Sequence, residues 1–226
     1  MKILIACESS GELRRRFADK GHAVISCDML PADDEWHSSS KNHFKGDVRE
    51  ILESDRFDMI IAHPPCTYLC VSGMHWTKRG LRDPQLTEDA LEFVKYLLSQ
   101  PAPYIAIENP VGVISTRIRK PDQYIQPYQF GDDASKKTGL WLKGLKKLKW
   151  EAYVEPRLVC CGEVIPEELW KYGCPYCCGD KKPLMRWGNQ TDSGQNKLGP
   201  SSDRWKERSK TYPGIANAIV RQWGFH

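Results

Sequence analysis

Phe57-Asp58-Met59-Ile60-Ile61-Ala62-His63-Pro64-Pro65-Cys66-Thr67-Tyr68-Leu69-Cys70 is the stretch that decides the fold. Its first half is a short apolar run, typical of a strand buried on both faces of a sheet. Pro64 and Pro65 then end the strand, because proline lacks a backbone donor and fixes the backbone. Cys66 follows at once, at the edge where open α/β sheets bind ligands. Taken alone, Cys66 is better explained as a buried structural cysteine after a rigid turn, and only the residues around it favour a functional role.

The composition limits the class of protein. The chain has 226 residues, enough for one ordinary domain with a small addition. Its formal charge of +4 permits a polyanionic partner without requiring one. The sequence contains no apolar run long enough to span a membrane and no charged-then-apolar leader, and nothing in it predicts an obligate protein partner. Nine cysteines without a secretion signal favour free thiols in a reducing cytoplasm.

The first 28 residues predict a strand, a turn, a helix and a second strand. The strand Lys2–Cys7 runs into the turn Glu8-Ser9-Ser10-Gly11, the helix covers Glu12–Lys20, and the second strand covers Ala23–Asp28. This is the mononucleotide-binding half of a doubly wound sheet, whose first turn offers backbone amides to a ligand. Asp28 is placed to accept hydrogen bonds from a ribose. The turn lacks the full glycine pattern, so a purely structural unit is the alternative.

A further strand brings a carboxylate to the edge that carries Cys66. Tyr104–Pro110 is an apolar strand that ends in charge, and Glu108 lies near its end. Burial raises the pKa of a carboxyl group, so Glu108 is a candidate acid that shares a proton with a bound ring. The alternative is a glutamate that caps the next loop. His43–Val48 predicts a short strand ending in another acid, and Leu86–Ser99 predicts an amphipathic helix.

Other segments predict less regular structure. Gly73–Pro84 interleaves aromatic and basic residues, and is either a mobile lid that contacts a polyanion or a solvated surface loop. Tyr124–Phe130 and Leu140–Leu142 predict additional strands. Lys181–Arg208 predicts a long loop, and Ile215–Trp223 a closing amphipathic helix.

Five of the nine cysteines gather between Val159 and Gly179. A Cys-x-x-Cys pair with a second cysteine pair upstream predicts a tetrahedral thiolate site for zinc. The candidate ligands are Cys160, Cys161, Cys174, Cys177 and Cys178, of which we expect the first four to bind. Adjacent cysteines rarely both bind one ion, so the choice of ligands stays open. A group of reduced thiols without metal is the alternative.

Together these segments resemble a compact cytosine-5 DNA methyltransferase of the kind that bacteriophages and prophages encode. The Pro-Cys and Glu-Asn motifs are the specific part of the resemblance, which runs in the family's order from end to end. The matching segments are Ile5–Gly11, Asp28, Lys45–Val48, Pro64-Pro65-Cys66, Ile107–Pro110, Arg117-Ile118-Arg119 and Tyr212–Ala216.

The resemblance implies a fold, a reaction and a set of site residues. The fold is α/β, a doubly wound, mostly parallel Rossmann-like methyltransferase sheet with a small cysteine-rich zinc-binding insertion. The cofactor is S-adenosylmethionine, and the partner is nucleic acid, most naturally DNA. The implied catalytic residues are Cys66, Glu108, Arg117 and Arg119. The implied cofactor-binding residues are Cys7, Glu8, Ser9, Ser10, Gly11, Asp28, Met29, Asp47, Val48 and His63.

The chain departs from the family pattern in four places, two of which are His63-Pro64-Pro65 at the start of the nucleophile motif and Pro110 in place of Val in the Glu-Asn motif. Glu8 and Ser10 stand where the cofactor turn usually has glycines, and the usual large target-recognition domain is missing. We therefore predict a catalytic core at 1–156, a cysteine-rich insertion and recognition loop at 157–204, and a segment completing the core at 205–226. Two rival functions stay open: an amino-group methyltransferase that holds its amine with the carbonyls of Pro64-Pro65, and a non-catalytic nucleic-acid-binding remnant.

Overall fold

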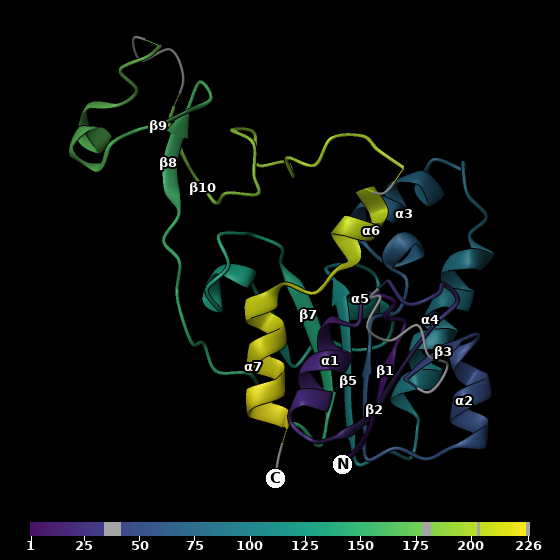
Figure 1. Cartoon of the computed structure of the whole chain (residues 1–226). Helices are drawn as coiled ribbons and strands as arrows, with labels where there is room; N and C mark the ends of the chain where they lie inside the picture. Colours follow the sequence, from purple (N-terminus) through teal and green to yellow (C-terminus); the bar gives the residue numbers. More distant parts are fainter. Residues whose placement is uncertain (34–41, 178–181, 203, 225–226) are drawn as a thin grey trace. The chain divides into compact units, whose positions relative to one another are not determined.

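The computed structural model of the chain describes residues 1–33, 42–177, 182–202 and 204–224. These form two compact units, whose elements are labelled in Figure 1. The first unit comprises Met1–Ile125, Lys137–Lys149 and Ala216–His226, and the second comprises Gln126–Lys136 and Trp150–Ile215. Among the described residues, no helix has the length and apolar character needed to cross a membrane.

A seven-stranded mixed sheet forms the first unit, with the strand order β3-β2-β1-β4-β5-β7-β6. Its strands are β1 (Lys2–Ala6), β2 (Ala23–Asp28), β3 (His43–Lys45), β4 (Met59–Ala62), β5 (Tyr104–Pro110), β6 (Gln123–Ile125) and β7 (Thr138–Lys143). Strands β1 to β5 are parallel, whereas β7 is antiparallel to both β5 and β6. The strand order reverses between β1 and β4, which is the position where open α/β sheets bind ligands.

Helices cover both faces of this sheet. They are α1 (Glu12–Asp19), α2 (Val48–Ser54), α3 (Val71–Lys78), α4 (Gln85–Leu98), α5 (Ile114–Arg117) and α7 (Pro213–Trp223). Alternate strand residues point to opposite faces, and Leu4 and Ile60 share one buried cluster with Ile51 of α2 and Leu91 of α4. Helices α1 and α7 lie on the other face (Figure 1), where Arg16 Nε donates to Asn217 Oδ1 at 2.8 Å. The predicted doubly wound, mostly parallel α/β fold is confirmed.

Two local predictions are wrong in part, and one helix was not predicted. The predicted irregular segment Gly73–Pro84 is partly helical, because α3 extends to Lys78. An added Cβ at Gly73 would lie 1.9 Å from the Thr67 carbonyl oxygen, so α3 is held by close backbone packing that hydropathy does not reveal. The predicted strand Tyr124–Phe130 stops at Ile125, because a 3-10 helix starts at Pro127. Helix α2 was not predicted at all.

The second unit is built on a small antiparallel sheet with the order β10-β8-β9. Its elements are β8 (Arg157–Cys160), β9 (Glu163–Val164), β10 (Leu184–Arg186) and α6 (Arg204–Ser209). The prediction of an uninterrupted loop over Lys181–Arg208 is therefore wrong, because β10 and α6 lie within it. This unit extends beyond the predicted insertion 157–204, since Gln126–Lys136 is bonded to it. Ser135 N, for example, donates to Asn189 Oδ1 at 2.9 Å.

Candidate active site and metal centre

Two hydrogen bonds join the Pro-Pro-Cys loop to the end of the neighbouring strand. Strands β4 and β5 are paired in parallel, with Ala62 opposite Ile107, so the loop after β4 and Glu108 of β5 meet at one edge. His63 Nδ1 lies 2.6 Å from Glu108 Oε2, and both side chains are nearly buried. The Asn109 amide donates to the Pro64 carbonyl at 2.7 Å. The sequence predicted that Cys66 and Glu108 share an edge, and the backbone pairing brings them there.

Cys66 begins a short 3-10 helix, Cys66–Tyr68, and its side chain is exposed. The loop after it packs closely against Gly112, where an added Cβ would lie 1.9 Å from the Leu69 carbonyl oxygen. Val113 N also donates to this carbonyl at 2.8 Å. Cys66 therefore presents its sulfur from a rigid backbone, as a nucleophile requires. It is not the buried structural cysteine of the alternative interpretation.

The structure places the two predicted catalytic arginines in ion pairs. Arg117 binds both carboxylate oxygens of Glu88, at 3.0 and 2.9 Å. Arg119 pairs with Asp122 at 2.7 Å and also donates to the Leu142 carbonyl at 3.0 Å. The first contact joins α5 to α4, and the second holds the segment after α5 to β7. A catalytic role for either arginine stays a prediction.

A pocket of about 360 Å³ lies at the carboxyl ends of β1, β2 and β4. Half of the predicted cofactor-binding residues line it, namely Cys7, Asp28, Met29, Asp47 and Val48. Pro64 and Pro65 contribute the side of the pocket that is continuous with the Cys66 loop. The pocket and Cys66 therefore share one edge of the sheet. A volume of this size falls in the range of sites for small molecules.

The other predicted cofactor residues lie elsewhere. Glu8, Ser9, Ser10 and Gly11 form the turn after β1, and His63 contacts Glu108 instead of lining the pocket. Glu8 is buried, and its Oε1 accepts from Leu13 N at 2.8 Å. Burial raises the pKa of the Glu8 carboxyl group, and the hydrogen bond from Leu13 partly offsets this. No hydrogen bond reaches Glu8 Oε2 from the part of the chain that is described.

Backbone conformation explains why the turn has its sequence. Gly11 has φ +70°, in the left-handed region that favours glycine, and it directly precedes α1. Cys7 has φ +59°, which is uncommon for a residue with a side chain. Strained conformations of this kind gather at ligand-binding sites. Burial raises the pKa of the Cys7 thiol, so it is a neutral wall of the pocket and not a second nucleophile.

The two predicted acids of the pocket are held in different ways. Asp28 Oδ1 accepts from Leu30 N at 2.9 Å, and burial raises the pKa of this carboxyl group. Asp47 caps α2 by accepting from Arg49 N at 2.9 Å, and its other oxygen pairs with the Arg49 guanidinium at 2.8 Å. Asp28 is therefore the acid with more capacity for a ligand hydroxyl.

Sequence reasoning missed one whole wall of the pocket. Helix α4 contributes Leu86, Asp89, Ala90 and Phe93 to the lining. The Arg49 guanidinium lies 4.9 Å from the centre of the Phe93 ring, which fixes both side chains. The sequence pattern of α4 indicates a face buried against the sheet, and Phe93 lies beside that face. The available signal was that Ala90 and Phe93 are apolar residues only partly buried against the core.

The second unit holds a cluster of four cysteines. The sulfurs of Cys160, Cys161, Cys174 and Cys177 all lie within 4.8 Å of one another. The Cys160 sulfur is 3.6 Å from that of Cys161 and 3.8 Å from that of Cys177. A tetrahedral zinc ion with Zn–S bonds of about 2.3 Å places its sulfurs about 3.8 Å apart, so the arrangement fits this ion. Cys178 lies outside the described residues.

A few buried apolar side chains support the cluster. Cys160, Ile165 and Cys174 are the buried residues of this small core, and Leu158 and Leu169 pack against it. This is little apolar burial for a folded unit. A structural metal would supply the missing stabilisation, as it does in small metal-binding domains.

Comparisons with known proteins add a limited amount. No protein-family model and no curated protein matches the chain. Among solved structures, it is similar to an Entamoeba histolytica methyltransferase, with 15% identity and a TM-score of 0.49, over 75% of this chain and 64% of the other. It is also similar to an E. coli protein assigned as a prophage-encoded DNA modification methyltransferase, with 13% identity and a TM-score of 0.42, over 63% of this chain and 46% of the other. The chain thus spans less than two thirds of either protein, and we take its function from its own residues.

Proposed function

We propose that this chain is an S-adenosylmethionine-dependent methyltransferase that methylates carbon 5 of cytosine in DNA through a covalent bond to Cys66. The observation that carries the proposal is the joined edge of β4 and β5, where the exposed Cys66 follows the loop bonded to Glu108 and Asn109. A nucleophile beside a carboxyl group is what attack on an electron-poor ring requires.

The adjacent pocket supports the choice of cofactor. Its apolar side chains, among them Leu69, Ala90 and Phe93, suit a purine ring, and the Asp28 carboxylate suits the hydroxyls of a ribose. The carboxyl group of Asp47 lies at the same pocket. S-adenosylmethionine, when bound there, would supply an electrophilic methyl group at the side of the pocket that Pro64 and Pro65 form.

Carbon 5 of cytosine is a weak nucleophile, so the ring must first be activated. The Cys66 thiolate adds to carbon 6, and the Glu108 carboxyl group donates a proton or hydrogen bond to ring nitrogen 3, which draws off the developing charge. After methylation, loss of the proton from carbon 5 breaks the bond between Cys66 and carbon 6 and restores the ring. The His63 contact to Oε2 fixes the Glu108 carboxyl group at the edge where the ring would bind.

Trapping of the covalent adduct tests the proposal. A DNA duplex with 5-fluorocytosine cannot lose its carbon 5 substituent, so it should remain attached to Cys66 and be identified by peptide mass spectrometry. Cys66→Ala should abolish both the adduct and methyl transfer. Cys70→Ser is the matched control, because Cys70 lies on the same loop without the predicted role, and it should retain both. Transfer to carbon 5 by Cys66→Ala at the wild-type rate would contradict the mechanism.

An amino-group methyltransferase is the competing enzyme class. That mechanism needs a backbone carbonyl of the Pro64-Pro65 pair to hold the amine, and the Pro64 carbonyl already accepts a hydrogen bond from Asn109. Nucleoside analysis separates the two classes, because the methyl group is found either on carbon 5 or on the exocyclic nitrogen.

We also propose that the four described cysteines of the second unit bind one structural zinc ion. Four thiolates complete a tetrahedral site and leave no open position for a substrate. Reduced thiols of this kind fit the cytoplasmic location predicted from the sequence. The zinc-bearing unit is then the predicted recognition module, in place of a large target-recognition domain.

A further inference from the structure

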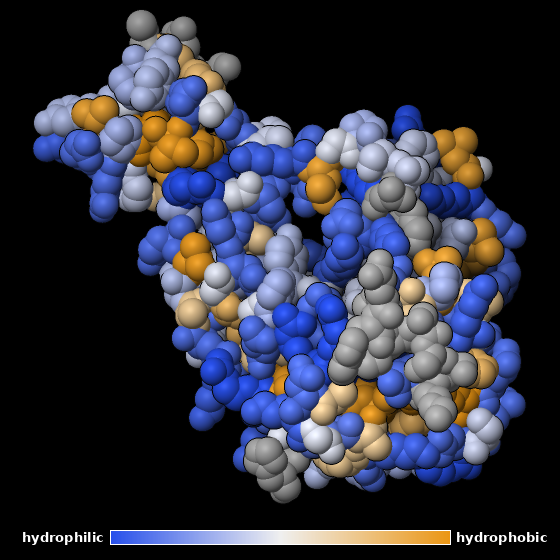
Figure 2. Space-filling view, viewed as in Figure 1, coloured by the Kyte–Doolittle hydropathy of each residue, from blue (hydrophilic) through white to orange (hydrophobic). Residues whose placement is uncertain are grey.

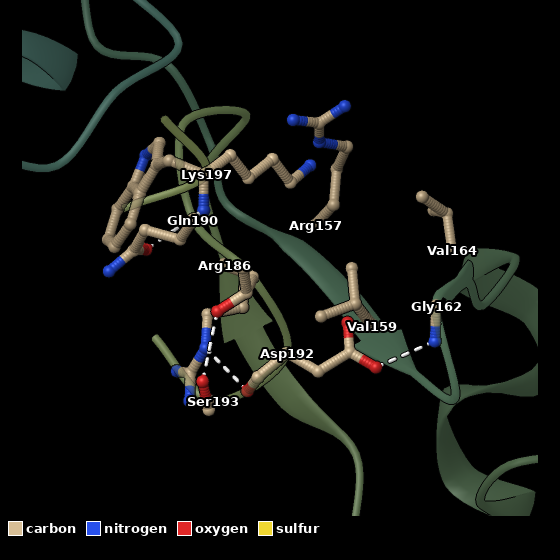
Figure 3. Close-up of a pocket in the computed structure, with 11 residues that line it drawn as sticks. Arg157, Val159, Gly162, Val164, Arg186, Gln190, Asp192, Ser193 and Lys197 are labelled. Atoms are coloured by element: carbon tan, nitrogen blue, oxygen red, sulfur yellow. Dashed lines mark hydrogen bonds between the residues drawn. The ribbon is translucent and has the colours of Figure 1, made fainter. Parts of the chain in front are cut away.

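The second unit contains a cavity of about 530 Å³ beside the cysteine cluster. Its walls come from β8, from the end of β10 and from the turns at 187–197 (Figure 3). All of its lining residues belong to this unit. The volume falls in the range of small-molecule sites, and the cavity shares no residue with the methyltransferase pocket.

The cysteine cluster and the cavity share a wall. Gly162 directly follows Cys160 and Cys161, and its backbone N–H donates to Asp192 Oδ2 at 2.6 Å (Figure 3). Asp192 lies in the turn that forms the opposite wall, so this bond holds the two walls together. A metal bound to the cysteines would fix the same wall from the other side.

Three further contacts make the cavity rigid. Arg186 Nε donates to the Asp192 carbonyl at 3.0 Å. The Trp187 ring stacks on Tyr128 with 4.2 Å between ring centres, and its indole N–H donates to the Val154 carbonyl at 3.0 Å. These walls are therefore fixed before a ligand arrives, which lowers the entropic cost of binding.

The rim of the cavity is cationic. Arg157, Arg186 and Lys197 line it together with a single carboxylate, that of Asp192. Arg157 pairs with Asp133, whereas no ion pair reaches the exposed Lys197 from any residue that the structure describes. In Figure 3 the Arg157 and Lys197 side chains extend over the same side of the cavity. A bound anion would meet two positive groups there.

The floor of the cavity is apolar. Val159 and Val164 line it, and Figure 2 shows an apolar patch among hydrophilic residues over the β8–β9 hairpin. The Val164 side chain is 48% exposed, although it lies on a strand. An apolar floor below a cationic rim suits a ligand with a flat apolar part and an anionic part, and does not suit a simple anion.

We propose that this cavity binds one nucleotide unit of the DNA substrate, with a phosphate at Arg157 and Lys197 and a base against Val159 and Val164. The inference rests on the proposed function, which supplies a DNA partner. The surrounding segment 181–210 carries eight Lys and Arg against three Asp and Glu, a field that attracts the phosphate backbone. The cavity thus gives the second unit a contact with DNA that is separate from the reacting cytosine.

Fluorescence anisotropy of a labelled DNA duplex, titrated with the full zinc-loaded chain between 50 and 200 mM salt, tests this site. Lys197→Gln should lower the slope of log affinity against log salt by about 0.9, which corresponds to about eightfold weaker binding at 0.1 M salt. The control is Lys171→Gln, an exposed lysine of the same unit outside the cavity, which should leave the slope unchanged. Equal slopes for the two variants would overturn the proposal.

A second pair of variants tests the apolar floor. Val164→Glu puts a carboxylate on the apolar surface that the base would contact, and should weaken binding more than Lys197→Gln does, whereas Val164→Gln has the shape of Glu without its charge. Because Val164 is exposed, neither change disturbs a core. If both variants bind DNA as tightly as the wild type does, the ligand does not enter the cavity.

The measurements also separate this inference from the proposed function. Affinity for S-adenosylhomocysteine, measured by calorimetry, should be the same in all four variants. Normal methyl transfer with unchanged DNA affinity in Lys197→Gln overturns the cavity site alone. Normal DNA binding through the cavity without any methyl transfer would instead overturn the proposed function.

Discussion

The two units of this chain are stabilised by different means. In the first, strands β1, β4 and β5 bury almost every apolar side chain, and Ile3, Leu4, Ile5, Ile105 and Ile107 have no exposed surface. In the second, one isoleucine and two cysteines are the buried residues of the cluster. Burial of an aliphatic side chain stabilises a fold by about 1.5–3 kcal/mol. The first unit can therefore fold on apolar burial, whereas the second, which also buries Phe130, Ala134 and Ile215, has less of it.

This difference also determines where each unit can hold polar functional side chains. A rigid apolar sheet can hold a few polar groups at the ends of its strands, which is where Asp28, Cys66 and Glu108 lie. The second unit has only a small three-stranded sheet in the part that is described, so its rigidity depends more on hydrogen bonds such as Gly162 to Asp192 and on the four sulfurs. A metal ion there would be part of the fold, whereas the first unit needs none.

Removal of metal should have the largest effect. Cys177→Ala, or a strong chelator, should unfold the second unit and leave the first unit folded, because structural zinc contributes on the order of 10 kcal/mol to small domains of this kind. Hydrogen exchange read by mass spectrometry reports the two units separately. The amides of β8 and β10 should lose protection, while those of β1 and β4 should keep it.

Cys70→Ser is the control for this comparison, because it removes a thiol from the first unit and should leave metal content unchanged. Atomic emission analysis of protein purified without chelator should find one zinc ion per chain. Purified chain that lacks zinc and still protects β8 from exchange would show that the second unit folds without metal.

Replacement of His63 should have the next largest effect. The sequence assigned His63 to the cofactor, whereas the structure places its Nδ1 2.6 Å from Glu108 Oε2. We expect His63→Leu to lower the single-turnover rate of methyl transfer by about 10- to 100-fold, because the acid loses its fixed orientation. His63→Asn keeps a donor near the position of Nδ1 and should recover most of the rate.

Cofactor affinity shows which assignment of His63 is correct. If His63 acts through Glu108, both variants bind S-adenosylhomocysteine as tightly as the wild type does, and only the rate changes. Weaker binding at an unchanged rate would instead support the assignment made from the sequence.

Asp28→Asn should have a smaller effect, confined to the cofactor. Asn keeps the acceptor that Leu30 N uses, but it loses the charge that strengthens hydrogen bonds to ribose hydroxyls. We expect about tenfold weaker binding of S-adenosylhomocysteine by calorimetry, as the loss of one charge-assisted hydrogen bond implies. Asp19→Asn, an exposed acid at the end of α1, is the control. Equal affinity of Asp28→Asn and the wild type would remove Asp28 from the cofactor site.

Sequence patterns predicted the first unit well because burial dominates it. The strands Ala23–Asp28 and Tyr104–Pro110 were predicted to the residue, since both-face burial and a terminal acid leave a clear signal. Helix α3 was missed because it is held by the approach of Gly73 to a carbonyl oxygen, which composition does not record. Helix α2 was missed because Asp47 was assigned to a ligand, although it also caps a helix.

The site was predictable where a residue lies at a strand end and not where it depends on packing between elements. Cys66 and Glu108 follow from strand order alone. The α4 wall of the pocket and the His63–Glu108 contact need the tertiary structure, because they join residues far apart in the chain. In the second unit, cysteine spacing predicted the cluster, whereas the cavity depends on turns whose sequence has no periodicity.

Glu8 is a buried acid of the first unit whose burial is unfavourable to its charged form, and its replacement should have the smallest effect. Burial raises the pKa of Glu8 in the folded chain, and the positive charges of His63 and Arg14 only partly oppose this. A group whose pKa is raised on folding stabilises the fold below its unfolded pKa, about 4.3, and this stability is lost as pH rises through the folded pKa.

Glu8→Gln keeps the acceptor for Leu13 N and removes the charge, so it should match the wild type near pH 4 and become more stable towards pH 8. The difference in free energy of unfolding is measured at several pH values by denaturant titrations in which hydrogen exchange of the β1 amides reports unfolding. The exposed Glu53→Gln should show no such trend, and a Glu8→Gln variant that is less stable at pH 8 would mean that the charge of Glu8 stabilises the turn.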